Sequence, residues 1–235
     1  MTGSMLSGRY RRRVSDMWVS WSGGKDAATA LAAARRAGAR VTGLLSTVTA
    51  GPGGAEIAVH GVGAGLVAAQ ADALGLPLHR VELPPSCPDR EYRARLRAAL
   101  APAAASGVTG LVHGDLALAD VRAFREEVLD GTGVTGVFPL WGGVTGALAT
   151  GMLDAGLRAV VVAVDPGRVP ARLAGAAFDA EFLAALPSGV DPCGENGEFH
   201  TFVTGGPGFA HDVPVAVTGT VARDGHVQAV LAPAR

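Results

Sequence analysis

The chain contains 235 residues, of which 49% are hydrophobic and 17% charged, enough apolar material for the core of one large domain or two small ones. Its 20 Lys and Arg residues against 21 Asp and Glu residues argue against a nucleic-acid-binding protein, and the arginine cluster within residues 9–13 is expected to be a solvated tail. No apolar run approaches the roughly twenty residues of a membrane span, and the distant pair Cys87 and Cys193 makes no disulfide framework. We expect a globular cytoplasmic protein that does not associate with membranes.

The first chemically informative stretch is a glycine turn between a predicted strand at 16–21 and a predicted helix at 27–37. Residues without Cβ let backbone N–H groups approach an anion, the helix N-terminus adds partial positive charge, and Lys25, the chain's only lysine, adds a full charge. The neighbouring Asp26 is suited to recruit Mg²⁺ for a nucleotide. We predict a polyphosphate site; the alternative is an ordinary tight turn with a solvated lysine. The turn reads Ser22-Gly23-Gly24-Lys25-Asp26.

This order resembles the Ser-Gly-Gly-x-Asp PP-loop of ATP pyrophosphatases, enzymes that cleave ATP between the α- and β-phosphates. The Walker A spacing does not occur in the chain. Members of that group usually carry Ser or Thr after the aspartate, whereas this chain has Ala27 there and Thr29 two residues further on. One hydroxyl contact to phosphate is therefore expected to be missing or displaced.

Strands alternate with helices through the first half of the chain, which predicts a parallel sheet with right-handed crossovers and with ligands beyond the carboxyl ends of the strands. The glycine turn lies at one such end and Asp115 at another, so Asp115 either faces the nucleotide or its metal, or caps a helix at 116–130. The remaining predicted elements are strands at 40–48, 78–83 and 110–113, helices at 66–74 and 89–104, and a glycine-rich loop at 49–56.

The second half begins with Gly131–Gly136, whose spacing fits Gly-x-Gly-x-x-Gly. Because it follows a helix and precedes a predicted strand at 137–140, we interpret it as a helix cap and loop rather than a dinucleotide site. We place a domain boundary at Asp115, which gives an ATP-binding domain at 14–115 and a smaller α/β domain at 116–235. Further predictions are helices at 144–153 and 179–186, a strand at 158–164, and antiparallel segments near 199–203, 213–221 and 226–231.

A second cluster of chemically active residues occupies 191–202 and holds a thiol, two glutamates, an imidazole and the chain's only asparagine. A hairpin explains Asn196-Gly197 but not the neighbouring charges. Metal binding by Cys193, Glu198 and His200 matches no zinc spacing. Cys193 is either a nucleophile paired with a histidine or a small packed residue.

The segment from Cys193 to Thr201 resembles the Cys-Gly-Glu-Asn-Gly-Glu-Phe-His-Thr signature of the diphthine–ammonia ligase (diphthamide synthetase) family. The resemblance covers residues 18 to 209 and implies an α/β fold with a Rossmann-like parallel sheet, of the adenine nucleotide α-hydrolase (HUP) type, followed by a smaller α/β substrate domain. Other matching stretches are Val59–Val62, Gly114–Leu116 with Arg122 and Arg125-Glu126 after it, Phe138–Trp141, and Val164-Asp165.

Members of this family that make diphthamide use ATP to adenylate the diphthine carboxyl group of elongation factor 2, and ammonia then displaces AMP. The resemblance implies ATP and Mg²⁺ as cofactors, ammonia and a carboxylate acceptor as partners, and a homodimer. Relatives with the signature occur where no diphthamide is made, so it favours ATP-dependent amide formation more than one acceptor. The implied roles are ATP binding by Ser20, Ser22, Gly23, Gly24, Lys25, Asp26 and Asp115, Mg²⁺ binding by Asp26, catalysis by Lys25, Asp26, Glu195 and Glu198, and substrate binding by His60, Cys193, Gly194, Asn196 and His200.

Two other functions fit a PP-loop. An RNA thiolase would need a reactive cysteine and a basic surface, and the balanced charge and lack of Cys-x-x-Cys disfavour it. A protein that binds ATP without turning it over is favoured by Ala27, because losing a hydroxyl weakens catalysis more than binding. Release of AMP and pyrophosphate separates a ligase from such a sensor.

Overall fold

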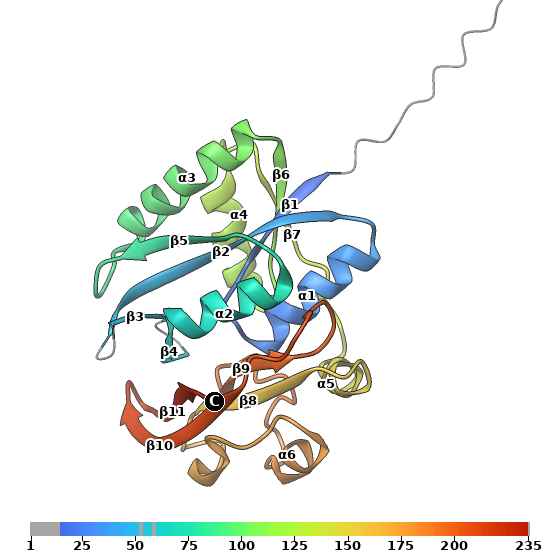
Figure 1. Ribbon diagram of the computed structural model, residues 1–235, viewed down its shortest axis with the longest axis vertical. Coiled ribbons are helices and arrows are strands. Elements are labelled where there is room, and N and C mark those ends of the chain that lie inside the picture. The colour runs from blue at the N-terminus through green and yellow to red at the C-terminus, as the bar shows by residue number, and fades with distance from the viewer. Residues whose placement is uncertain (1–14, 52–53, 58–59, 235) are drawn as a thin grey trace, which may run out of the picture.

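The computed structural model describes residues 15–51, 54–57 and 60–234. Two sheets lie one above the other, a large one with its helices and a smaller one that carries the C-terminus (Figure 1). The arginine cluster within residues 9–13 and Val59 lie outside the described residues.

The large sheet is built around five parallel strands, which confirms the predicted parallel sheet. β2 lies between β5 and β1, β6 lies on the other side of β1, and β7 follows at the edge. This arrangement brings the carboxyl ends of β1, β2 and β6 to the same edge of the sheet, where ligands bind in such folds. The strands are β1 (Asp16–Ser20), β2 (Arg40–Gly51), β5 (Leu78–Leu83), β6 (Val108–Val112) and β7 (Thr135–Val137).

Helices cover both faces of the large sheet. Successive side chains along each strand point to opposite faces, so each face offers side chains for the helices to pack on. Trp18 packs on one face and the next residue, Val19, on the other. α1 (Lys25–Arg36) and α2 (Ala64–Leu74) pack on the Val19 face, whereas α3 (Asp89–Ala105) and α4 (Ala119–Leu129) pack on the Trp18 face.

The predicted loop at 49–56 is wrong, because β2 continues to Gly51 and pairs antiparallel with β3 (Gly54–Ile57), which in turn pairs with β4 (Val62–Gly63). The glycines that suggested a loop serve the hairpin instead. A Cβ at Gly51 would overlap the Glu56 carboxylate, so glycine permits this close approach.

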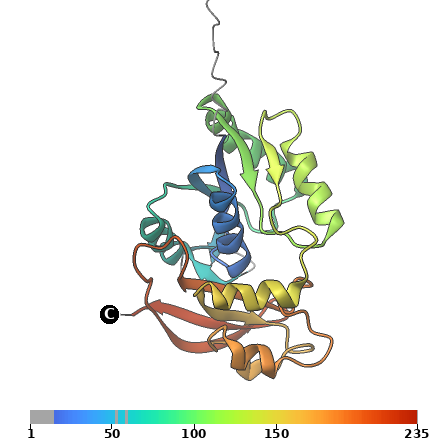
Figure 2. The ribbon, with the colours of Figure 1, turned by 90° about the vertical axis from the view of Figure 1, so that its right-hand side faces the viewer.

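The small sheet is antiparallel, in the order β10-β11-β8-β9, which confirms the predicted antiparallel additions. Figure 2 shows α5 lying across this sheet, and the N-terminal end of α1 reaching it from above. Its elements are α5 (Thr145–Asp154), β8 (Arg158–Val164), the 3-10 helix η1 (Ala171–Leu173), α6 (Ala180–Ala185), β9 (Phe199–Gly205), β10 (Val215–Arg223) and β11 (His226–Pro233).

Two predicted element boundaries are wrong. The strand expected at 137–140 is β7 at Thr135–Val137, and the following residues turn at Pro139, which cannot donate a ladder hydrogen bond. α4 begins at Ala119 with Leu118 as its N-cap, so Asp115 does not cap it. Gly131 and Gly133, at φ of 72° and 79°, form the predicted turn between helix and strand.

The division at residue 115 stays a prediction. α4 and β7 lie beyond it and yet belong to the large sheet, so a division by sheet membership falls between β7 and α5. One apolar cluster joins Leu31 of α1 and Val67 of α2 to Val161 of β8 and Phe202 of β9. The two sheets therefore share a core. Among the described residues, no helix combines the length and apolar character needed to cross a membrane.

Candidate functional site

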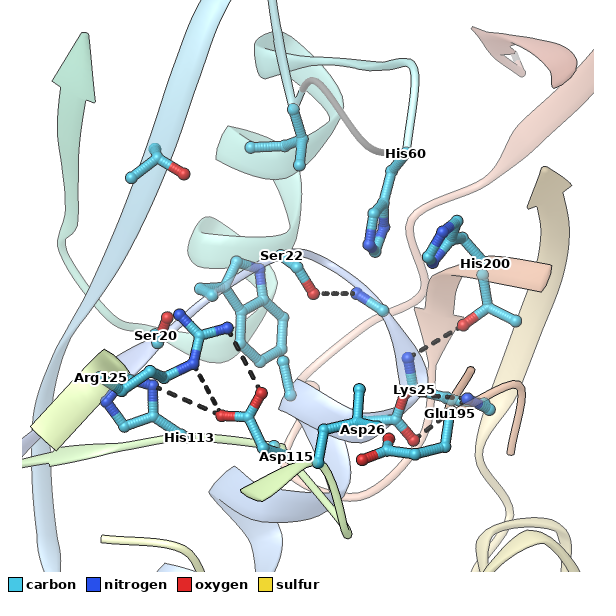
Figure 3. Close-up of a pocket in the computed structure, with 18 of the residues that line it drawn as sticks. Ser20, Ser22, Lys25, Asp26, His60, His113, Asp115, Arg125, Glu195 and His200 are labelled. Carbon is cyan, nitrogen blue, oxygen red and sulfur yellow. Dashed lines mark hydrogen bonds and ion pairs between the residues drawn. The ribbon is translucent and has the colours of Figure 1, made fainter. Parts of the chain in front are cut away.

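A cleft of about 910 Å³ lies between the two sheets, at the carboxyl ends of β1, β2 and β6. Figure 3 shows His60 and His200 side by side at one end, Arg125, His113 and Asp115 together at the other, and Lys25 and Asp26 between them. Eleven predicted site residues line the cleft: Ser20, Ser22, Gly24, Lys25, Asp26, His60, Asp115, Gly194, Glu195, Asn196 and His200. The other three, Gly23, Cys193 and Glu198, are not among the lining residues.

The glycine turn is held from behind by Gln70 of α2, whose side chain is fully buried. Its Nε2 donates to the carbonyls of Gly23 (3.0 Å) and Val203 (2.6 Å), and its Oε1 accepts from Trp21 Nε1 (3.0 Å). Gly23 has φ of 80°, and a Cβ there would lie 2.8 Å from Gln70 Oε1. Glycine is thus required by both conformation and space. Sequence reasoning missed Gln70, although an uncharged polar residue within the largely apolar sequence of α2 was a usable signal.

Two other glycines allow a side chain and a backbone segment to approach closely around the cleft. A Cβ at Gly24 would lie 3.0 Å from His60 Cε1, and a Cβ at Gly114 would lie 2.7 Å from the carbonyl carbon of Asp26. The first turn of α1 also contributes N–H groups that have no partner within the helix. An anion suits this cradle, because these groups and the helix N-terminus are positive.

Lys25 is only 2% exposed, and its ammonium group faces the second motif. Nζ donates to the Cys193 carbonyl and to Asp26 Oδ2 (2.8 Å), and it lies 5.2 Å from the centre of the Phe199 ring. The Lys25 backbone N–H donates to Thr201 Oγ1 (3.0 Å). Lys25 therefore joins the glycine turn to the loop at 191–201, a link that the sequence did not predict.

The carboxylate of Asp26 is one-third exposed where the cleft meets α1. Burial raises its pKa, and the charge of Lys25 opposes this effect. Within the described part of the chain, no group of three or more His, Cys, Asp or Glu side chains is arranged to hold a metal ion. Asp26 fits Mg²⁺ only as one ligand of an ion that takes its other oxygens from phosphate and water.

Ala27 leaves the expected hydroxyl position without an oxygen. Thr29 does not replace it, because its Oγ1 donates to the Lys25 carbonyl (2.7 Å) along the helix and does not line the cleft. The hydroxyl contact suggested by the resemblance is therefore missing at Ala27 rather than moved to Thr29.

The two glutamates of the second motif have different environments. Glu195 lines the cleft, and its Oε1 accepts from the backbone N–H groups of Leu116 (3.0 Å) and Ala117 (2.8 Å). This carboxylate ties the loop at 191–201 to the segment that follows β6. Glu195 therefore connects the two sides of the cleft between the sheets.

Glu198 is fully buried and holds its own loop together. It accepts from the side chain (3.0 Å) and backbone (2.9 Å) of Asn196 and pairs with Arg168 (2.9 Å). Burial disfavours its charge, but hydrogen bonds from Asn196 and nearby backbone groups more than compensate and lower its pKa. Each of these contacts favours a permanently ionised carboxylate.

Cys193 is a packed residue in this structure. It is 2% exposed, and its Sγ lies 3.3 Å from the Thr145 carbonyl. Burial raises its pKa to about 12, so the thiol is not a nucleophile at neutral pH.

His60 and His200 stack with ring centres 4.9 Å apart. Burial, followed by the charge of Lys25, lowers the pKa of His60 to about 4, and burial together with His60 lowers the pKa of His200 to about 3. Both imidazoles are neutral at pH 7. The Nδ1 atom of His60 is buried and has no hydrogen-bond partner among the described residues.

Asp115 belongs to a group of polar residues at the opposite end of the cleft. Arg125 Nε (2.8 Å) and Nη2 (3.3 Å) bind its two oxygens, and His113 Nδ1 lies 3.9 Å from Oδ2. Tyr92 of α3 also lines this end. Sequence reasoning did not assign His113, Arg125 or Tyr92 to the site, because their distance in sequence from the glycine turn hides their proximity.

The fold contains a parallel α/β sheet. A Ser-Gly-Gly-Lys-Asp turn lies at the carboxyl end of β1, and an anion cradle lies at the start of the following helix. These features define a PP-loop ATP-utilising protein. A family model described as the diphthamide synthase N-terminal domain matches residues 15–136, just over half of the chain. The chain belongs to this family, whose domain is of the PP-loop ATP pyrophosphatase type. It is accordingly a PP-loop ATP-utilising enzyme.

Proposed function

We propose that the protein is an ATP-dependent ligase of the diphthine–ammonia ligase type, which adenylates a carboxylate and converts it to an amide with ammonia. The observation that carries the proposal is the contact between the two motifs: Lys25 of the PP-loop donates to the carbonyl of Cys193 and, through its backbone, to Thr201. ATP and acceptor would thus meet in one cleft.

In the proposed first step, an oxygen of the acceptor carboxylate attacks the α-phosphorus of ATP, and the bond to the β-phosphate oxygen breaks to release pyrophosphate. The N–H groups at the start of α1 would stabilise the charge on the departing pyrophosphate. Asp26 would hold Mg²⁺, which would supply further positive charge. Asp115, which follows β6 and lines the cleft, would face the nucleotide from that side.

In the second step, the nitrogen of ammonia attacks the acyl carbon and loses a proton, and AMP departs. Neutral His60 and His200 are suited to accept hydrogen bonds from ammonia, because a protonated imidazole would only donate. We assign the proton to Glu195 Oε2, since Oε1 accepts from Leu116 and Ala117. Glu198 then serves to position the loop rather than to transfer protons.

The direct test measures pyrophosphate, AMP and amide product with ATP, Mg²⁺, ¹⁵N-ammonia and candidate carboxylates, including the modified elongation factor. We expect pyrophosphate release to depend on the acceptor, and ¹⁵N to appear in the product. Lys25→Ala should abolish pyrophosphate release, whereas Arg36→Ala, an exposed position at the end of the same helix, should not. Intact release in Lys25→Ala would refute the nucleotide half of the proposal.

The substrate half is tested by Glu195 and Glu198. Glu195→Gln should lower amide formation while ATP binding persists, and Glu198→Gln should lower it through a disordered loop. Full amide formation in both variants would contradict this half.

The ATP-sensing alternative is supported by Ala27, which removes a hydroxyl from the cradle. In the same experiment, tight binding of unchanged ATP under every condition supports the sensor. The thiolase alternative gains no support from Cys193, whose buried thiol has a raised pKa.

A further inference from the structure

β10 (Val215–Arg223) is the outer strand of the small sheet, and among the described strands it pairs only with β11. Figure 1 places it at the margin of the molecule, away from the large sheet. Residues 216–222 are all exposed. An outer strand of this kind presents unpaired N–H and C=O groups to any chain that lies beside it.

The sequence of this strand is a palindrome. Residues 216–222 read Ala-Val-Thr-Gly-Thr-Val-Ala, which is the same in both directions about Gly219. Two antiparallel copies of such a strand, related by a two-fold axis through Gly219, place each residue opposite its own kind. A two-fold interface requires self-complementarity of this sort.

In this arrangement, the pairs of facing residues favour association of the two strands. Thr218 lies opposite Thr220 and Val217 opposite Val221, and threonine pairs and pairs of β-branched residues stabilise neighbouring antiparallel strands. Gly219 meets Gly219 at the axis, where two residues without side chains permit the closest approach of the two backbones.

The strand also lacks the features that normally prevent such pairing. Residues 215–222 carry no charge and no proline, and the arginine that follows, Arg223, is drawn into an ion pair with Glu56. Three of the large apolar residues that are notably exposed lie on this hairpin: Val217 at 42%, Val221 at 46% and Val230 at 45%. Charged side chains and prolines are the usual protection of an edge strand.

One irregularity limits the paired length. A bulge shifts the register with β11 between Val217 and Gly219, while Gly219 to Arg223 pair regularly with β11. The bulge places Thr218, the residue next to the axis, outside the regular ladder, so the paired length is short and the contact stays at the low end of interface sizes, below about 1,200 Å² in total. Because the interface is small, we expect the dimer to be in exchange with the monomer.

We propose that two copies of this chain associate through β10, antiparallel about Gly219, to form one continuous sheet from their two small sheets. The partner that pairs with the free edge of β10 is a second copy of this chain, because the sequence of the strand is complementary to itself. This inference goes beyond the proposed function and does not depend on it.

Cross-linking at the axis tests the register. In a Cys87→Ser background, Gly219→Cys places two thiols where paired Cα atoms lie about 4.5–5.5 Å apart, within the range a disulfide spans. The position accepts a side chain, since a Cβ there meets nothing within 4 Å. Pairing raises the effective thiol concentration toward millimolar, so we expect linkage about tenfold or more faster than for Gly65→Cys. Gly65 is the matched control, an exposed glycine on α2 with equal space for a Cβ.

Sedimentation of the protein over a series of concentrations tests independently whether copies of the chain associate through β10. The pair Thr218→Lys and Thr220→Lys sets like charges opposite each other and should abolish association. The pair Thr218→Lys and Thr220→Glu sets opposite charges together and should restore it. Linkage of Gly219→Cys no faster than Gly65→Cys, or association unchanged by the two lysines, would overturn the proposal.

Discussion

His113 is the buried side chain of the cleft that most lacks a partner. It is 3% exposed and stacks on Phe138, yet both ring nitrogens are without a hydrogen bond among the described residues. Burial, with the charge of Arg125, lowers its pKa to about 3. Between that value and the ordinary value near 6.5, the unfolded chain takes up a proton that the folded chain refuses, so stability falls as the pH falls.

We predict that His113→Phe flattens this dependence. Each such histidine contributes up to about 1.4 kcal/mol per pH unit in that window. The free energy of unfolding, measured by urea titration at pH 7 and pH 5, should therefore drop less in the variant than in the wild type. His211→Phe, which replaces an exposed histidine, is the control. An identical drop in wild type and His113→Phe would mean that His113 is not held neutral.

Glu198 gives a second prediction. Glu198→Gln keeps the shape but presents an amide to the N–H donors of Asn196 and Asp191 and loses the charge that pairs with Arg168. We expect a loss of about 1–3 kcal/mol in the free energy of unfolding at pH 7. Because the folded pKa is lowered, this contribution is present above the ordinary pKa near 4.5 and is lost as the pH falls through the folded value. The difference from wild type should therefore shrink in acid. Glu181→Gln, an exposed position, should change little.

At the scale of elements, α2 does more than cover the sheet. Its Gln70 joins the PP-loop at Gly23 to β9 at Val203, so one helix fixes both the glycine turn and the strand that follows the second motif. β9 also donates directly to the turn, from Val203 N to the Gly23 carbonyl (2.9 Å). The anion cradle is therefore held by three elements that are distant in sequence.

Gln70→Leu should disrupt this arrangement. The substitution removes the side-chain hydrogen bonds to the Gly23 and Val203 carbonyls and leaves the buried Trp21 indole N–H without its partner, at a cost of about 1–3 kcal/mol for that unsatisfied group. We expect lower stability in urea titration and, at temperatures where the variant remains folded, weaker ATP binding by calorimetry. Asp72→Asn, on the exposed side of the same helix, is the matched control. ATP affinity equal to that of wild type would show that the clamp is not needed for the loop.

At the scale of the whole molecule, the two sheets form one cooperative unit, since a single apolar cluster includes residues from both. The family model ends at residue 136, but the core does not. Without the small sheet, α1 would lose its contacts with β9.

We therefore predict that a chain ending at residue 143 does not fold cooperatively. Thermal unfolding followed by far-UV circular dichroism should be broad, and the truncated chain should bind an apolar dye that the full chain excludes. The full chain should unfold in one transition. A sharp transition of the truncated chain near the melting temperature of the full chain would show that the large sheet is independent.

Much of this organisation followed from local patterns. The parallel strands, their helices and the antiparallel tail were predictable because apolar periodicity and glycine turns act over a few residues. The hairpin β2–β3 was missed because Gly51 looked like a loop residue, and only its close approach to Glu56 explains it. The start of α4 was misplaced because Asp115 is a good cap by composition, whereas Arg125 holds it in the cleft.

By itself, the sequence determined that this chain is a PP-loop protein with a second motif near its C-terminus, because both signals are contiguous. Only the tertiary structure decided how the motifs cooperate: Lys25 turns to the Cys193 carbonyl, Glu195 spans the cleft, and Glu198 and Cys193 lie behind it. The physical reason is that burial and hydrogen-bond partners come from residues far apart in the chain. A carboxylate at 195 and one at 198 look alike in sequence and differ only in what surrounds them.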